Sequence, residues 1–107
     1  MPKSLLIQAH PNRNGMEAVD PALLDGIEIL NLHPNHNSRN GITAAAAKKE
    51  GFSIVTAGSD FHHPNQGHEG LTALRAPSLP TDSFEIARLL KEQNYLLEFA
   101  GNRIILP

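Results

Sequence analysis

The residues best suited to chemistry lie in segment 53–70, directly after a short apolar run that ends at Gly58. One carboxylate and three imidazoles follow within nine positions: Asp60, His62, His63 and His68. Asp60 and His62 are two residues apart, so their side chains share one face of an extended backbone. A carboxylate oxygen beside an imidazole nitrogen suits a divalent ion such as Zn, Mn or Fe. We therefore predict that Asp60 and His62 bind a metal ion, the alternative being a capping aspartate beside a packed histidine.

Two other apolar runs, residues 4–9 and 27–30, also end in polar turns that carry histidine. His10 follows the first run, and His33 and His36 follow the second among several asparagines. Three apolar runs that each end in histidine form a more specific signal than any one of them alone. We therefore predict a site role for His10, the alternative being a strand-end histidine bonded to nearby backbone.

Substrate-binding residues are predicted near the second of these turns. His36 and Arg39 are expected to contact the substrate, and an arginine is suited to bidentate hydrogen bonds with carboxylate or phosphoryl oxygens. The alternatives are a polar loop whose asparagines satisfy their own turns and an arginine that is only solvated. Membership of the site stays open for three further histidines: His33, His63 and His68.

The three apolar runs are the predicted strands that position these side chains: residues 4–9, 27–30 and 53–57. The segments between them, 10–26 and 31–52, are long enough for the ~10–12 residues that a parallel crossover needs. The carboxyl ends of parallel strands lie at one edge of such a sheet, where ligand-binding residues gather. The pattern therefore predicts an α/β fold with parallel strands and one site at their carboxyl ends.

Capping signals mark the predicted helices. Asp20 and Pro21 begin a brief helix, and a longer helix spans about 39–50 with Gly51 as its stop. A third helix begins at a capping box, Asp82 with Glu85, and is followed by a hairpin of residues 95–99 and 103–106. Buried helix residues are predicted to be Ile42, Ala45 and Ala46 in the longer helix and Phe84, Ile86, Ala87 and Leu90 in the third.

Composition limits the class of protein. The chain has 107 residues, so we expect a single domain over 1–107. Its formal net charge is -2 and it has no basic run, which disfavours nucleic-acid binding. It has no cysteine, so any metal ion must be held by His, Asp, Glu or Asn. No apolar run approaches the ~18 residues of a membrane span and no signal peptide precedes the first strand, so a cytoplasmic location is expected.

Three motifs, taken in order, resemble the PHP domain family, the polymerase and histidinol phosphatase type. They are Ala9-His10-Pro11, then Gly26-Ile27-Glu28-Ile29-Leu30-Asn31, then Gly58-Ser59-Asp60-Phe61-His62. The Gly-Ser-Asp-Phe-His motif is fairly specific to the family. The other two motifs are weak signals alone and support the resemblance because all three occur in this order. The resemblance covers about residues 4–70.

This resemblance implies the C-terminal part of a distorted (β/α)7 barrel, with about three parallel β/α units, a C-terminal helix and a β-hairpin. It also implies up to three divalent metal ions (Mn, Zn or Fe) that hydrolyse phosphate mono- or diesters through metal-activated water. By the family motifs, His10, Asp60 and His62 are metal ligands and Glu28 is a structural support, and no residue is assigned as catalytic. The family's N-terminal His-X-His motif does not precede His10, so the chain is expected to supply only the C-terminal part of the site.

Two other classes of function stay open. One is a non-catalytic metal-binding or structural half-barrel, whose open sheet edges need a second copy or a partner chain. The other is a nucleic-acid module, which the acidic balance and the single tyrosine disfavour. For the phosphoesterase we expect a small-molecule or nucleotide phosphoester as substrate and no membrane partner. A homodimer or a separate N-terminal half is the expected protein partner.

Overall fold

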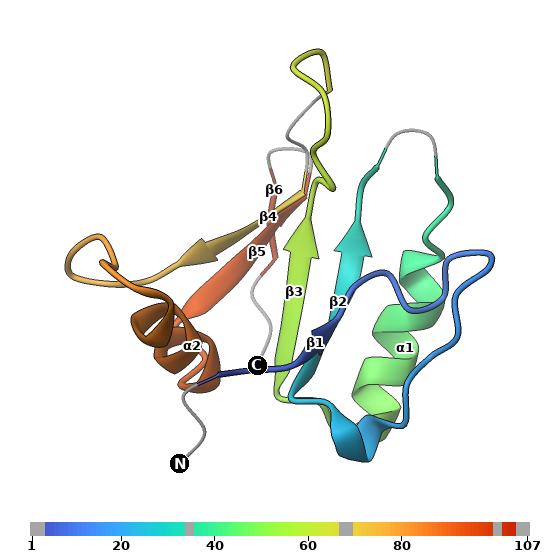
Figure 1. Ribbon diagram of the computed structural model, residues 1–107, viewed down its shortest axis with the longest axis horizontal. Coiled ribbons are helices and arrows are strands. Elements are labelled where there is room, and N and C mark those ends of the chain that lie inside the picture. Colours follow the sequence, from blue (N-terminus) through green and yellow to red (C-terminus); the bar gives the residue numbers. More distant parts are fainter. Residues whose placement is uncertain (1–3, 34–35, 67–69, 100–101, 105–107) are drawn as a thin grey trace.

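The computed structural model describes residues 4–33, 36–66, 70–99 and 102–104, and this part contains two three-stranded sheets and two α-helices (Figure 1). The first sheet is parallel, in the order β1 (Ile7–Gln8), β2 (Gly26–Asn31) and β3 (Ile54–Gly58). The second sheet is antiparallel, in the order β4 (Gly70–Leu74), β5 (Tyr95–Phe99) and β6 (Asn102–Ile104). The three predicted parallel strands are confirmed, although β1 is only two residues long. The final hairpin is confirmed up to Ile104, and residues 105 and 106 of the predicted strand lie outside the described residues.

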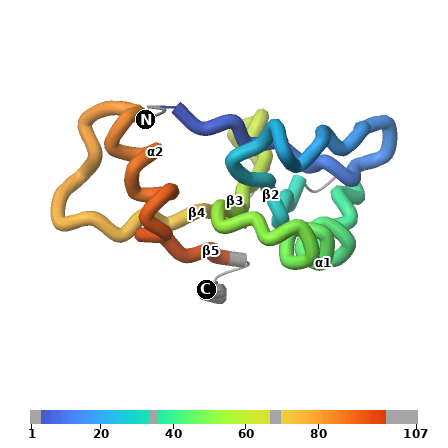
Figure 2. Tube along the Cα trace, turned by 90° about the horizontal axis from the view of Figure 1, so that it is seen from below, coloured from blue at the N-terminus to red at the C-terminus, as the bar shows by residue number. Residues whose placement is uncertain are grey.

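Helix α1 (Asn40–Glu50) connects β2 to β3 and packs against the parallel sheet (Figure 2). It ends, as predicted, at Gly51, whose positive φ of 74° is accessible to glycine without the steric cost of a Cβ. The backbone N–H of this glycine bonds back to the carbonyls of Ala47 and Lys48, so the last turn of the helix is satisfied.

The prediction that α1 buries Ile42, Ala45 and Ala46 is wrong, since Ala45 is exposed and Ala46 is only half-buried. Ile42 is 61% exposed, whereas Thr43 and Ala47, four residues apart on one face, are almost fully buried. Burial of Thr43 is tolerated because its hydroxyl donates to the carbonyl of Arg39 and accepts from the side-chain amide of Asn12. Small residues on this face let the helix lie close to the sheet.

The prediction of part of a (β/α)7 barrel, with about three parallel β/α units, is wrong. The connection from β1 to β2 has only a 3-10 helix, η1 (Pro21–Leu23), capped by Asp20 as predicted. One complete unit, β2–α1–β3, is present in the described residues, and the chain then forms the antiparallel sheet. The sequence of a short apolar strand does not show whether the strand pairs parallel or antiparallel. In the structure, β4 pairs antiparallel with β5 along its whole length.

Helix α2 (Ser83–Lys91) lies beside the antiparallel sheet, at the opposite end of the molecule from α1 (Figures 1 and 2). Its predicted capping by Asp82 is confirmed, because that carboxylate accepts the Glu85 N–H at 2.9 Å. Of the side chains predicted to be buried, Phe84 is 57% and Ile86 is 40% exposed, so these two predictions are wrong. Neither α1 nor α2, the α-helices of the described residues, is long and apolar enough to cross a membrane.

The two sheets are joined by hydroxyl groups along the outer edge of β3. The hydroxyl of Tyr95 accepts the Val55 N–H at 3.0 Å and donates to the Ser53 carbonyl at 3.4 Å. Further along, the hydroxyl of Thr72 accepts the Ala57 N–H and donates to the Ala57 carbonyl. These bonds satisfy the strand edge, and the core around β3 includes the fully buried Leu97 of the second sheet.

We expect Tyr95→Phe to lower the free energy of unfolding by about 1–3 kcal/mol, because the buried Val55 N–H loses its acceptor. The measurement is urea unfolding followed by circular dichroism. Ser78→Ala, a hydroxyl deletion at an exposed position, is the matched control and should leave the midpoint unchanged. A Tyr95→Phe variant as stable as the wild type would contradict the assigned role of this hydroxyl.

Candidate functional site

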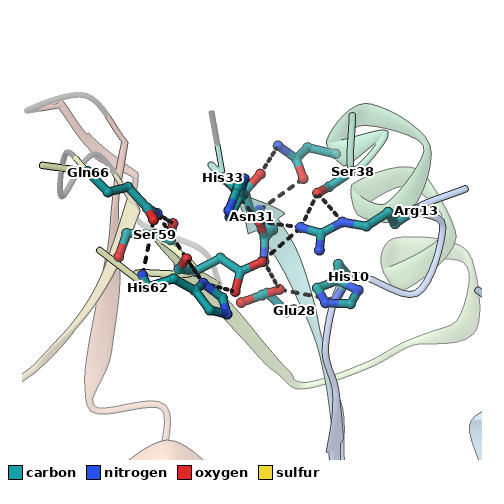
Figure 3. A network of polar contacts seen from close by, with 11 residues as sticks. His10, Arg13, Glu28, Asn31, His33, Ser38, Ser59, His62 and Gln66 are labelled. Carbon is teal, nitrogen blue, oxygen red and sulfur yellow. Dashed lines mark hydrogen bonds and ion pairs between the residues drawn. The ribbon is translucent and has the colours of Figure 1, made fainter. Parts of the chain in front are cut away.

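Polar residues from all three parallel strands meet at the carboxyl edge of the first sheet (Figure 3). His10 lies two residues after β1, Asn31 is the last residue of β2, and Asp60 lies two residues after β3. His10 (φ 28°) and Asp60 (φ 53°) both have the left-handed backbone that residues with a side chain rarely adopt. Such conformations cost roughly 1–3 kcal/mol each and cluster at functional sites.

The side-chain amide of Asn31 is the junction of this edge. Asn31 is 4% exposed, and its Nδ2 donates to Glu28 Oε1 at 2.8 Å and to Asp60 Oδ2 at 3.4 Å. Its Oδ1 accepts a hydrogen bond from Arg13 at 2.8 Å. The amide therefore orients two carboxylates and one guanidinium, which belong to three different segments of the chain.

Arg13 is the functional residue that the sequence prediction missed. Its Nη2 lies 3.0 Å from Asp60 Oδ2, and this ion pair is largely enclosed, with the two side chains 13% and 17% exposed. The same nitrogen donates to Ser38 Oγ at 3.0 Å, and Ser38 is buried just before α1. The signal in the sequence was the position of Arg13 in the turn after the first predicted strand. The turn-forming residues around it account for this segment equally well without a site.

Two opposing effects set the charge of Asp60. Partial burial raises the pKa of this carboxyl, but hydrogen bonds from Arg13 and Asn31 and the positive charge of Arg13 together lower it below its ordinary value of 3.8. Asp60 is therefore ionised at neutral pH.

Glu28 and His10 form the second half of the edge. Glu28 Oε1 accepts the backbone N–H of His10 at 3.0 Å, which is a supporting contact of the kind expected for this residue. A Cβ at Gly58 would stand 2.7 Å from Glu28 Oε2, so any larger residue there would require the Glu28 carboxylate to shift. The imidazole Nδ1 of His10 is buried and has no hydrogen-bond partner among the described residues. Depending on the tautomer of the ring, this nitrogen could accept or donate a hydrogen bond at this edge.

The imidazole of His62 is oriented by the backbone of its own turn. Its Nδ1 lies 2.6 Å from the carbonyl oxygen of Asp60, which can only accept, so Nδ1 carries the proton and Nε2 has the lone pair. Gln66 holds the turn, because its amide donates to the carbonyls of Ser59 and Asp60 and accepts the His62 N–H. The ring is 59% exposed, so Nε2 is accessible to a ligand.

Three imidazoles lie close together beside Asp60. The ring centroids of His33 and His36 are 4.5 Å apart, and those of His33 and His62 are 5.7 Å apart. Partial removal from water and the neighbouring His36 lower the pKa of His33 below 6.5, which favours its neutral form. The structure therefore places His33, which the sequence left open, close both to His36, a predicted substrate-binding residue, and to His62.

The remaining predicted residues lie outside this cluster of contacts. Arg39 precedes α1 in a left-handed conformation, and its side chain is exposed and reaches the Asn12 carbonyl at 3.4 Å. His63 is exposed in the loop after His62. His68 lies outside the described residues.

The arrangement does not fit a metal ion as it stands. In the described part of the chain, no group of three or more His, Cys, Asp or Glu side chains is placed to hold one. Asp60 uses Oδ2 for Arg13 and Asn31, and its Oδ1 faces His62 Nδ1 at 3.4 Å. His62 and His10 have ring nitrogens that could bind a metal ion, but the Asp60 carboxylate is already neutralised by Arg13.

The low pKa of Asp60 predicts a pH-dependent contribution to stability. Since its folded pKa lies below 3.8, the ionised carboxylate stabilises the fold above that pH, and this contribution is lost as the pH falls through the folded pKa. Asp60→Asn should therefore be less stable than the wild type by roughly 1–3 kcal/mol at pH 7. The difference should be smaller at a pH below 3.8 than at pH 7.

Urea unfolding of the wild type and Asp60→Asn at both pH values measures this, with Ser78→Ala as a control that should follow the wild type throughout. A difference that is the same at both pH values would mean that the ion pair is not its source.

No family model, no characterised protein and no solved structure matches this chain.

Proposed function

We propose that this chain supplies part of a metal-dependent phosphoesterase site, formed at the carboxyl edge of β1, β2 and β3. The observation that supports it best is the left-handed backbone of His10 and Asp60, each two residues beyond a strand of the same sheet. Strain that is retained at two strand ends, and that turns both residues to one edge, is typical of a functional site. The resemblance of the three motifs to the PHP family supports the reaction class.

The residues of this chain have separate roles in the proposal. Asp60, His62 and His10 would be this chain's ligands for divalent metal ions (Mn, Zn or Fe), and the metal would supply an activated water in a complete site. Since no group of three such side chains is formed among the described residues, the proposal places the remaining ligands outside them, and the described residues alone define no reaction step. The exposed His62 Nε2, with its lone pair, suits either metal binding or proton acceptance.

A phosphoester suits a guanidinium and an imidazole near this edge. Arg39 is exposed beside the start of α1, and the centroid of the His36 ring lies 4.5 Å from that of His33. Both are proposed to bind phosphoryl oxygens, and guanidinium and imidazole groups suit that role. A net charge of -2 favours a small-molecule or nucleotide substrate over a nucleic acid, and a cytoplasmic location is part of the proposal.

We expect Mn²⁺- or Zn²⁺-stimulated release of p-nitrophenol from p-nitrophenyl phosphate at millimolar metal by the protein in which the site is complete. Asp60→Ala and His62→Ala should lower that rate at least about tenfold, because both remove a proposed metal ligand. Glu92→Gln, which alters an exposed ion pair on α2, is the matched control and should keep the wild-type rate. A wild-type rate equal to that of Asp60→Ala at saturating metal would refute the proposal.

A second candidate is a non-catalytic metal-binding or structural part that needs another copy or a partner chain. The favouring observation is that β1, among the described residues, has a strand neighbour on one side only. An open parallel edge invites pairing with another strand.

This candidate predicts a dimer by size-exclusion chromatography with light scattering. A charge placed on the edge, Ile7→Lys, should shift the protein toward the monomer, while Leu79→Lys at an exposed loop position should not. A monomer at high concentration would count against it.

A further inference from the structure

We propose that a cavity between α1 and the segment that connects β1 to β2 binds a small organic cation, an amine on an apolar body. The connecting segment passes beside α1 (Figures 1 and 2), and the cavity between them has a volume of about 280 Å³. None of the proposed metal or substrate ligands lines it. The inference is therefore separate from the proposed phosphoesterase function and goes beyond it.

The walls of the cavity are apolar side chains from several parts of the chain. They include the buried Ile27 of β2, the half-buried Leu24 and Phe52, Ala46 of α1 and Val19 of the connecting segment. Ligand pockets in proteins are mostly apolar with a few polar groups, and their volumes begin at roughly 300 Å³. A single aromatic ring with a short substituent is therefore the size of ligand that suits this cavity.

Side-chain hydrogen bonds hold the connecting segment in place over the cavity. The Gln8 amide donates to the Glu17 carbonyl at 2.7 Å and accepts the Val19 N–H at 2.8 Å. The Asn12 amide donates to Thr43 Oγ1 of α1 at 2.8 Å. Gln8 and Asn12 themselves line the cavity, so its walls are positioned by directional bonds and not by side chains that fill the space. A cavity that is formed before the ligand arrives lowers the ordering cost of binding.

The charged side chains that line the cavity are both acidic. They are Asp20, which caps η1 through one carboxylate oxygen, and Glu50, the last residue of α1. Glu50 is exposed, and its carboxylate has no hydrogen bond or ion pair with the described residues. Lys48 and Lys49 belong to the same helical turn, but neither lines the cavity. Since a helix C-terminus disfavours a negative charge and favours a positive one, a cationic ligand is favoured beside Glu50.

The position of Glu50 also avoids complete burial of the ligand's charge. Glu50, Leu24 and Phe52 line a second hollow beside the first, together with the exposed Gly51 and Ser53. An ammonium group beside Glu50 can keep part of its hydration there while the apolar body of the ligand is buried. Complete removal of a charge from water is costly, so this arrangement selects an amine whose charge lies at one end.

The test is an NMR titration of the isotope-labelled protein at neutral pH with benzylamine, which is then protonated, and with benzyl alcohol as its uncharged counterpart. Benzylamine should shift the backbone amide resonances of Val19, Leu24 and Phe52 saturably. Its dissociation constant should be about 1 mM, because a ligand with so few atoms gains little binding free energy. Benzyl alcohol should bind about three- to tenfold more weakly, because it lacks the charge.

Single substitutions locate the binding. Ala46→Leu places apolar atoms in the cavity and should abolish the benzylamine shifts. Ala45→Leu, at the neighbouring exposed position of α1, is the matched control and should bind as the wild type does. Glu50→Gln should weaken benzylamine binding about three- to tenfold and leave benzyl alcohol binding unchanged. Glu92→Gln on α2 should change neither affinity.

The inference would be overturned by the absence of saturable shifts, by equal affinity for the two compounds, or by benzylamine binding that survives Ala46→Leu. Circular dichroism checks that each variant is folded. If Ala46→Leu does not fold, Glu50→Gln at its exposed position decides: a loss of affinity for benzylamine alone supports the site, and no loss, or an equal loss for both compounds, refutes it. These measurements use neither a metal ion nor a phosphoester, so their outcome is independent of the proposed function.

Discussion

The ends of the three parallel strands are held by one buried amide, the side chain of Asn31. This position requires a donor and an acceptor at once: Nδ2 donates to Glu28 and Asp60, while Oδ1 accepts from Arg13. An aspartate here would lack the donor and add a negative charge, and a leucine would remove the hydrogen bonds to Glu28, Asp60 and Arg13 together. The backbone N–H and carbonyl of Asn31 are in turn bonded by the side chain of Asn40, the first residue of α1. The amide therefore fixes the helix and the strand ends as one unit.

The same junction determines how charge is distributed at the edge. Arg13 contacts Asp60 directly, whereas the hydrogen bonds to the Glu28 carboxylate come from N–H groups of His10 and Asn31. N–H dipoles stabilise a carboxylate without cancelling its charge. The lowered pKa of His33 favours its neutral form, so that ring adds little positive charge at neutral pH. Within the described part of the chain, this edge of the sheet therefore has more hydrogen-bond acceptors than positively charged groups.

Strand positions were predictable because each buried strand is a short apolar run that ends in polar residues, and Gly51 and Asp82 mark their helix ends by well-understood local rules. These signals are local. The partner of Arg13 was not predictable, since its contact with Asp60 spans 47 residues and nothing near Arg13 in the chain encodes it. Its neighbours Asn12, Asn14 and Gly15 have turn chemistry that accounts for the segment without any site. The barrel was mispredicted for a related reason, because strand pairing is also a long-range property.

The hydroxyl groups of Tyr95 and Thr72 explain why the parallel sheet stops at β3. They bond the outward-facing N–H groups of Val55 and Ala57, the positions at which a fourth parallel strand would have to pair. This edge of the sheet is consequently closed. Among the described residues, β1 at the other end has a strand neighbour on one side only. A strand that extends this sheet would therefore have to add beside β1, next to His10.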